Sequence, residues 1–155
     1  MPYRDIPLPP QPYGVGYASG CFDLFHVGHL RFLQQAAEHC RQLIVGVPVD
    51  AIVGDASNKG RPPIFSVEQR LEVIAALRCV ARAVAAEVSM ETSSEFADFV
   101  QQFQPEAIFV GEDWRSTPRW RRLGSELLAR GIKVHFLPRA ANISSTHIKQ
   151  ALLGQ

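Results

Sequence analysis

The feature that most constrains the fold is an alternation of short apolar runs with amphipathic segments along most of the chain. Five apolar runs have the length and composition of strands: residues 15–19, 43–47, 83–88, 107–110 and 134–137. Apolar residues at helical spacing occupy the intervening and terminal segments 28–39, 67–77, 94–103, 118–129 and 145–153. Parallel strands need such crossovers, which are right-handed. The sequence therefore predicts a Rossmann-like, doubly wound α/β domain with a five-stranded parallel sheet flanked by helices.

Local signals divide the chain further. Ser66 and Gln69 have the spacing of a capping box, which predicts the start of a helix. The segment 50–63 is polar, contains two glycines and two adjacent prolines, and is predicted to be a loop. Residues 1–13 contain five prolines and are predicted to form an extended arm, with residues 14–155 as a single domain.

Composition excludes several classes of protein. The chain has 155 residues, 46% of them hydrophobic, and a net charge of +1, which argues against a nucleic-acid-binding surface. No apolar run approaches the roughly 18 residues of a membrane span. The three cysteines, Cys21, Cys40 and Cys79, form no Cys-x-x-Cys pair. They favour a reducing compartment, so we expect a cytoplasmic protein.

The stretch 20–29, Gly-Cys-Phe-Asp-Leu-Phe-His-Val-Gly-His, joins the first predicted strand to the first predicted helix. Helix N-termini carry unpaired N–H groups and a positive dipole end, which favour bound phosphate. His26 and His29 add donors, and Gly28 lets a ligand approach the backbone. Zinc would need further ligands that are not nearby in sequence, and simple helix capping explains single histidines better than a pair. The pattern therefore indicates a phosphate-binding site.

The same stretch resembles the His-x-Gly-His motif of the nucleotidyltransferase superfamily, in the form found in cytidylyltransferases. Three further motifs follow in that family's order: Arg70 with Arg78, Gly111-Glu112-Asp113-Trp114, and Arg139 with Ile143-Ser144-Ser145-Thr146. Together the motifs cover roughly residues 15 to 150, and they are most similar to those of bacterial glycerol-3-phosphate cytidylyltransferases.

This resemblance implies an enzyme that transfers CMP from CTP to a small phosphorylated alcohol, by default glycerol 3-phosphate. Pyrophosphate would leave and a CDP-linked product would form. The resemblance also implies Mg²⁺ carried largely by the triphosphate, and a homodimer. Two alternatives stay open: an adenylyltransferase of the same superfamily, and a non-catalytic nucleotide-binding module on the same fold.

The resemblance also assigns roles to individual residues. Four are assigned to catalysis: His26, His29, Lys59 and Arg139. Twelve are assigned to nucleotide binding: Cys21, Phe22, Asp23, Gly28, Arg70, Arg78, Gly111, Asp113, Ile143, Ser144, Ser145 and Thr146. Residues 114–122 contain four arginines and two tryptophans, and arginine binds phosphate in bidentate fashion, although these arginines do not match the family pattern. From this cluster we assign acceptor binding to Trp114, Arg115 and Arg119, together with Asp50. No residue is assigned to a protein-bound metal.

Some of these positions have alternative interpretations or depart from the family pattern, and Ser145 could simply cap the last helix. Lys59 could be a solvated loop lysine. Trp114, together with Trp120, could be a core or dimer contact instead of a ligand-binding residue. Cys21 stands where the family usually has threonine, so one hydroxyl donor is absent there.

Overall fold

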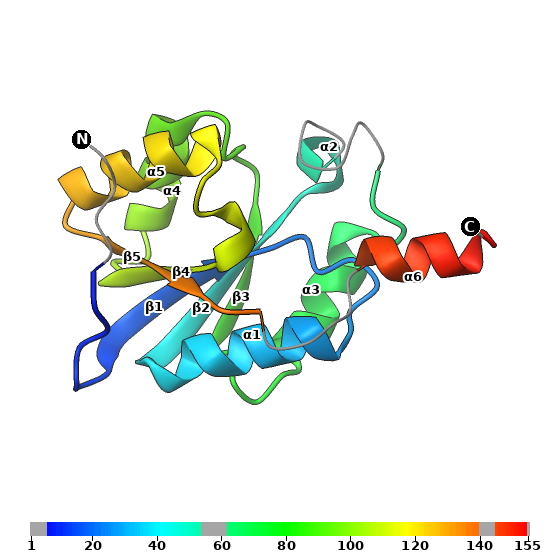
Figure 1. The fold of residues 1–155 in the computed structure, drawn as a ribbon, viewed down its shortest axis with the longest axis horizontal. Helices are drawn as coiled ribbons and strands as arrows, with labels where there is room; N and C mark the ends of the chain where they lie inside the picture. Colours follow the sequence, from blue (N-terminus) through cyan, green and yellow to red (C-terminus); the bar gives the residue numbers. More distant parts are fainter. Residues whose placement is uncertain (1–5, 54–61, 140–144, 155) are drawn as a thin grey trace.

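A five-stranded parallel sheet forms the centre of the computed structural model, which describes residues 6–53, 62–139 and 145–154 (Figure 1). Its strands lie in the order β3-β2-β1-β4-β5. The strands are β1 (Tyr13–Ser19), β2 (Cys40–Pro48), β3 (Arg82–Ala86), β4 (Ala107–Gly111) and β5 (Lys133–Leu137). This arrangement confirms the predicted fold class.

Helices cover both faces of the sheet. They are α1 (Val27–Glu38), α2 (Asp50–Val53), α3 (Val67–Ala75), α4 (Ser93–Gln101), α5 (Pro118–Ala129) and α6 (Ser145–Leu152), with a 3₁₀ turn η2 (Glu112–Trp114). Helices α1 and α3 lie on one face, and α4 and α5 lie on the other (Figure 1). Two apolar cores result, one containing Leu33 and Ile74 and the other containing Phe96 and Leu123.

Two differences from the sequence predictions change the predicted organisation of the chain. Asp50–Val53 is a helix, so the prediction of a loop is wrong for these four residues. The negative charge of Asp50 is stabilised by the positive end of that helix. Asp50 is also paired with Arg70, a contact that the sequence pattern does not reveal. Tyr13 is not part of an arm but the first residue of β1, and its hydroxyl lies 2.7 Å from Nε2 of His135.

The start of α3 agrees with the predicted capping box. Ser66 has an extended backbone, and its Oγ accepts a hydrogen bond from the N–H of Gln69 at 3.3 Å. The side chain of Gln69 accepts in return from the N–H of Ser66 at 3.2 Å. Two helix N-terminal donors are thus satisfied reciprocally, and the prediction of a capping box is confirmed.

The order of the strands reverses between β1 and β4. From β1 the chain proceeds outward to β2 and β3, whereas β4 leads to β5 on the other side. Ligands of doubly wound folds bind at such a switch point, outside the carboxyl ends of the strands. The stretch 20–29 leaves β1 there, and Glu112–Trp114 leaves β4 there. The fold thus brings two of the four sequence motifs to one edge of the sheet.

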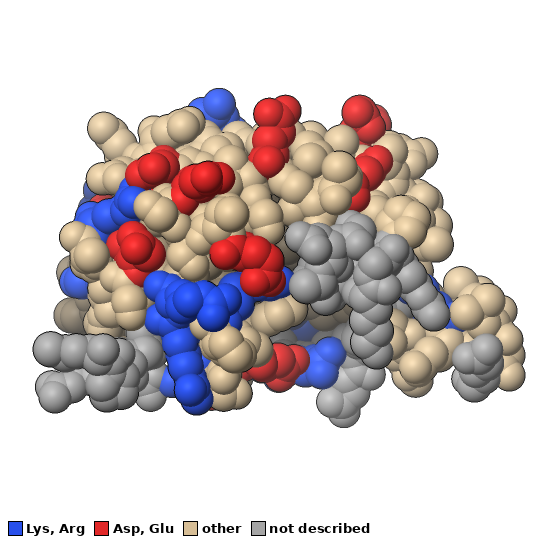
Figure 2. Space-filling view, turned by 90° about the horizontal axis from the view of Figure 1, so that it is seen from above, with Lys and Arg blue, Asp and Glu red and all other residues tan. Residues whose placement is uncertain are grey.

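Charges of both signs are interleaved on the face that Figure 2 displays. Lysine and arginine side chains there lie next to aspartate and glutamate side chains instead of forming a uniformly basic surface. Among the helices that the structure describes, none combines the length and the apolar character needed to cross a membrane.

Candidate functional site: a histidine pair at the switch point

The turn after β1 has an unusual backbone. Phe22 and Leu24 both have positive φ values, 54° and 50°, which bulky residues rarely adopt. Gly20 permits this turn, because a Cβ at position 20 would lie 2.7 Å from the Phe22 ring. Each left-handed residue costs on the order of 1 kcal/mol or more. The turn directs Asp23 inward, where it is only 3% exposed.

Asp23 joins three separate segments. Its Oδ2 accepts the N–H of Ile64 at 2.8 Å, and its Oδ1 accepts the N–H of Phe65 at 3.0 Å. Lys149 of α6 places its Nζ 3.1 Å from Oδ2. Burial raises the pKa of Asp23, but these donors outweigh burial, and its pKa is lowered below the ordinary 3.8. The buried carboxylate therefore fastens the turn to the segment before α3 and to α6.

Asp23→Asn should lower the free energy of unfolding by about 2 kcal/mol at pH 7, because an amide cannot replace both acceptor oxygens and the charge. A depressed folded-state pKa stabilises the fold above pH ~4, and that stabilisation is lost as pH falls through the folded pKa. Urea unfolding of both proteins at pH 7, 5 and 3 should therefore show a difference that shrinks at pH 3. A difference that stayed constant over this range would contradict an ionised Asp23.

His26 and His29 form a stacked pair at the start of α1. Their ring centroids are 3.8 Å apart with an interplanar angle of 25°. Nδ1 of His26 accepts the N–H of Gly28 at 3.0 Å, and Nδ1 of His29 accepts the N–H of His26 at 3.4 Å. In a neutral imidazole one nitrogen accepts and the other donates. Both rings therefore carry their proton on Nε2, which is the nitrogen left for a ligand.

The surroundings of both histidines favour the neutral form. Burial lowers the pKa of His26, and the positive charge of Arg139 lowers it further. Burial and then His26 lower the pKa of His29 to about 4, against a smaller opposing effect of Asp23. Within residues 6–53, 62–139 and 145–154, Nε2 of His26 is buried without a hydrogen-bond partner. A buried donor without a partner is costly, and a bound anion would satisfy it.

A cavity of about 360 Å³ opens beside His29 at the carboxyl ends of the strands. Apolar side chains form much of its wall, including Phe22, Met90, Phe96 and Trp120. Fewer of the lining side chains are polar: Ser19, Asp23, His29, Ser89, Glu91, Arg119, Thr146 and Lys149. An apolar cavity with few polar groups is the usual form of a small-molecule site.

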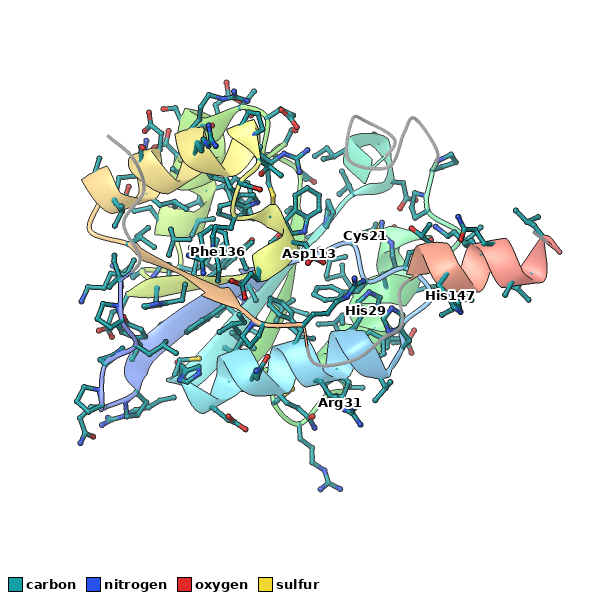
Figure 3. All side chains as sticks on the ribbon, viewed as in Figure 1. Cys21, His29, Arg31, Asp113, Phe136 and His147 are labelled. Carbon is teal, nitrogen blue, oxygen red and sulfur yellow. The ribbon has the colours of Figure 1, made fainter. Side chains whose placement is uncertain are left out.

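The structure brings many of the predicted site residues to this cavity. Eight of them line it: Cys21, Phe22, Asp23, His29, Gly111, Trp114, Arg119 and Thr146. In Figure 3, Cys21, His29 and Asp113 lie at the same edge of the sheet. Arg139 lies 3.6 Å from Asp113 as an exposed ion pair. Arg115 packs over the ring of Phe136 at 5.0 Å and pairs with Glu112.

Other predicted residues lie elsewhere. The Arg70 side chain is completely buried and donates to the carbonyl oxygens of Phe65 and Cys21, at 3.0 and 3.1 Å, and to Asp50 at 2.6 Å. Arg70 therefore stabilises the backbone of the turn instead of lining the cavity, and Asp50 is its ion-pair partner. Arg78 lies in the exposed turn between α3 and β3, at the amino end of the sheet, away from the cavity.

Some assignments cannot be placed. Lys59, Ile143 and Ser144 lie outside the residues that the structure describes, and Ser145 is described only as the first residue of α6. Among the described residues, no group of three or more His, Cys, Asp or Glu could hold a metal ion.

Sequence reasoning missed Lys149 and the segment Ser89–Glu91, all of which line the cavity. Lys149 follows Thr146 by three residues, so both lie on one side of α6, and this spacing was a usable signal. Ser89 to Glu91 follow β3, and polar residues just beyond a strand's carboxyl end are candidates in any doubly wound fold.

A doubly wound parallel sheet with a histidine pair at its switch point agrees with the nucleotidyltransferase resemblance of the sequence. The family model described as Cytidylyltransferase-like matches residues 17–151. The chain therefore belongs to the cytidylyltransferase-like family of the nucleotidyltransferase superfamily.

Two curated relatives illustrate the range of similar proteins. The chain is 38% identical over 118 residues to an FAD synthase of Pyrococcus abyssi, an alignment that covers 76% of this chain and 74% of that protein. It is 31% identical over 135 residues to the bifunctional protein HldE of Hyphomonas neptunium. That alignment covers 86% of this chain but 26% of HldE, so the chain spans about a quarter of that relative.

Solved structures agree with the fold. The chain is 27% identical to a lipopolysaccharide core biosynthesis protein from Thermoplasma volcanium, with a TM-score of 0.65 over 84% of this chain and 99% of that one. A pantothenate synthetase from Thermus thermophilus matches with a TM-score of 0.61 at 16% identity, over 91% of this chain and 66% of that one. The second likeness concerns the fold alone.

Proposed function

We propose that this protein transfers a nucleoside monophosphate group from a nucleoside triphosphate to a small phosphorylated alcohol. An oxygen of the acceptor phosphate bonds to the α-phosphorus, the bond from that phosphorus to the bridging oxygen breaks, and pyrophosphate leaves with the electron pair. The product is a nucleoside diphosphate joined to the alcohol. Such reactions depend mainly on positioning and on stabilising developing negative charge.

The histidine pair carries this proposal. Two neutral rings whose Nδ1 atoms accept backbone N–H groups present Nε2–H donors at fixed positions, at the start of a helix. A donor fixed in advance needs no reorganisation when charge develops on the α-phosphate or on the leaving oxygen. Two cations would add positive charge near the bound triphosphate. They are Arg139, whose charge acts on His26, and Lys149, which pairs with Asp23.

CTP is the donor that the family description favours, and it agrees with the resemblance of residues 111–114 to Gly-Asp-Asp-Trp. ATP is a second candidate, favoured by the similarity to an FAD synthase. FAD consists of FMN joined to an adenylyl group, so its synthesis is the same reaction with a different base. No curated relative named above has a glycerol phosphate in its name, and the acceptor is therefore proposed as a class.

Mg²⁺ is proposed as the partner of the triphosphate, because it prefers hard oxygen ligands and retains water. The carboxylate of Asp23 is already engaged by N–H groups and Lys149, so the triphosphate itself supplies the better ligands. Bound there, the metal would offset negative charge on the triphosphate. A homodimer and a cytoplasmic location stay predictions from the sequence resemblance.

Pyrophosphate release with each of the four nucleoside triphosphates, against a panel of phosphorylated alcohols, tests the proposal. We expect turnover with CTP, or with ATP if the FAD synthase similarity extends to the donor. Each active pair should give a product containing the nucleoside monophosphate and the acceptor, identified by mass spectrometry. Tight binding of a nucleotide without turnover on any acceptor would instead favour a non-catalytic module.

A further inference from the structure

Glu91 and Arg119 form a polar pair on the otherwise largely apolar wall of the cavity. Glu91 lies beyond β3 and Arg119 lies in the first turn of α5. Both Nε and Nη2 of Arg119 donate to Oε1 of Glu91, the former at 2.8 Å. The guanidinium carbon also lies 5.3 Å from the centre of the Trp114 ring, within the range of a cation–π contact. The two contacts fix the orientation of the guanidinium.

This pair leaves one donor group and one acceptor atom available to a ligand. Among the residues with defined positions, Nη1 of Arg119 has no hydrogen-bond partner, although its side chain is only 14% exposed. Oε2 of Glu91 forms a long ion pair with the exposed Arg122, whose Nη2 lies 3.9 Å away, and this distance leaves Oε2 without a hydrogen bond from Arg122. The fixed Nη1 donors suit a phosphate oxygen, and the carboxylate oxygen suits a hydroxyl donor.

We propose that Glu91 and Arg119 bind the acceptor and determine its class, an inference that rests on the transfer reaction proposed above. Nη1 of Arg119 binds an oxygen of the acceptor phosphate, and Oε2 of Glu91 accepts hydrogen bonds from hydroxyl groups of the acceptor. The neighbouring apolar wall packs against the carbon skeleton. The acceptor is then a phosphate monoester of a polyhydroxylated chain, because an acceptor without hydroxyls would offer no donor to Oε2 of Glu91.

Calorimetric binding of two probes tests the pair: glycerol 3-phosphate and n-propyl phosphate, which lacks the hydroxyls. Titrations use the full chain with the α,β-methylene analogue of CTP or of ATP present, so that no turnover occurs. The wild type should prefer glycerol 3-phosphate by on the order of tenfold. Glu91→Gln should lose most of that preference, and Arg119→Met should weaken both probes by on the order of tenfold or more.

Arg121→Met is the matched control, since Arg121 is an exposed arginine of the same helix and does not line this cavity. It should bind both probes as the wild type does. Equal binding of the two probes by the wild type, or absence of binding, would overturn the inference. So would an Arg119→Met variant that binds the probes normally but has lost affinity for the nucleotide analogue.

These outcomes separate the inference from the proposed function. If the protein preferred glycerol 3-phosphate over n-propyl phosphate but released no pyrophosphate in the turnover assay, the acceptor site would stand and the proposed transfer reaction would be wrong. If pyrophosphate were released equally with acceptors that have hydroxyls and with acceptors that lack them, the transfer reaction would stand and the proposed role of Glu91 would be wrong.

Discussion

His29→Ala should lower kcat by on the order of 10²- to 10³-fold, which is the usual cost of removing one fixed donor from a charge-stabilising site. His29 lines the cavity, and its Nδ1 is engaged by the N–H of His26, so Nε2 is the atom that a phosphate would meet. Steady-state kinetics with the best nucleotide and acceptor pair measure the change. The KM for the nucleotide should change much less, because the donor acts mainly on charge that develops during the reaction.

Two variants control for loss of packing. The ring of His29 lies 5.4 Å from that of Phe22 and 5.5 Å from that of Phe25, so the alanine variant also loses some stability. His29→Gln keeps an N–H donor near the position of Nε2 and should lose less activity than His29→Ala. His39→Gln changes the C-cap residue of α1, which does not line the cavity, and should be fully active. A His29→Ala protein that stayed folded and kept most of its activity would refute the assigned site.

Arg70→Met should lower the free energy of unfolding by about 3 kcal/mol. The Arg70 side chain is completely buried, and its donors satisfy the carbonyl oxygens of Phe65 and Cys21 as well as Asp50. Methionine fills much of the volume but leaves both carbonyls without this charged donor, at about 1–3 kcal/mol for each unsatisfied group. Urea unfolding followed by circular dichroism gives the difference.

Arg78→Met provides the matched comparison, because Arg78 is exposed in the turn after α3. Surface substitutions of this kind change stability by about 0.5 kcal/mol or less. Nucleotide affinity, measured on the folded fraction of each variant, distinguishes a supporting residue from a ligand-binding one. If Arg70→Met unfolded like the wild type but had lost nucleotide affinity, Arg70 would contact the nucleotide directly.

Much of the fold follows from local pattern in the sequence. The apolar runs at 43–47 and 107–110 coincide with parts of β2 and β4, because parallel strands buried on both faces are nearly continuous in apolar character. Ser66 and Gln69 mark the start of α3, because a capping box depends only on residues three positions apart. The helix Asp50–Val53 does not follow from local pattern, since the ion pair of Asp50 with Arg70 spans 20 positions.

The candidate site, too, could be predicted only in part from local sequence. The residue types of the stretch 20–29 are sufficient to indicate a phosphate site and the superfamily. The positive φ values of Phe22 and Leu24 have no sequence signal, since nothing about phenylalanine or leucine favours that conformation. They become visible only with the backbone, together with the inward direction of Asp23.

By itself, the sequence determined the parallel α/β architecture and the kind of ligand expected after the first strand, because both depend on periodicity and on neighbouring residues. The tertiary structure decided which arginines reach that site. Arg70 is buried behind the turn, Arg78 lies at the other end of the sheet, and Arg119 lines the cavity. Whether an arginine supports the backbone or faces a ligand depends on contacts between elements distant in sequence. Those contacts exist only once the elements are packed together.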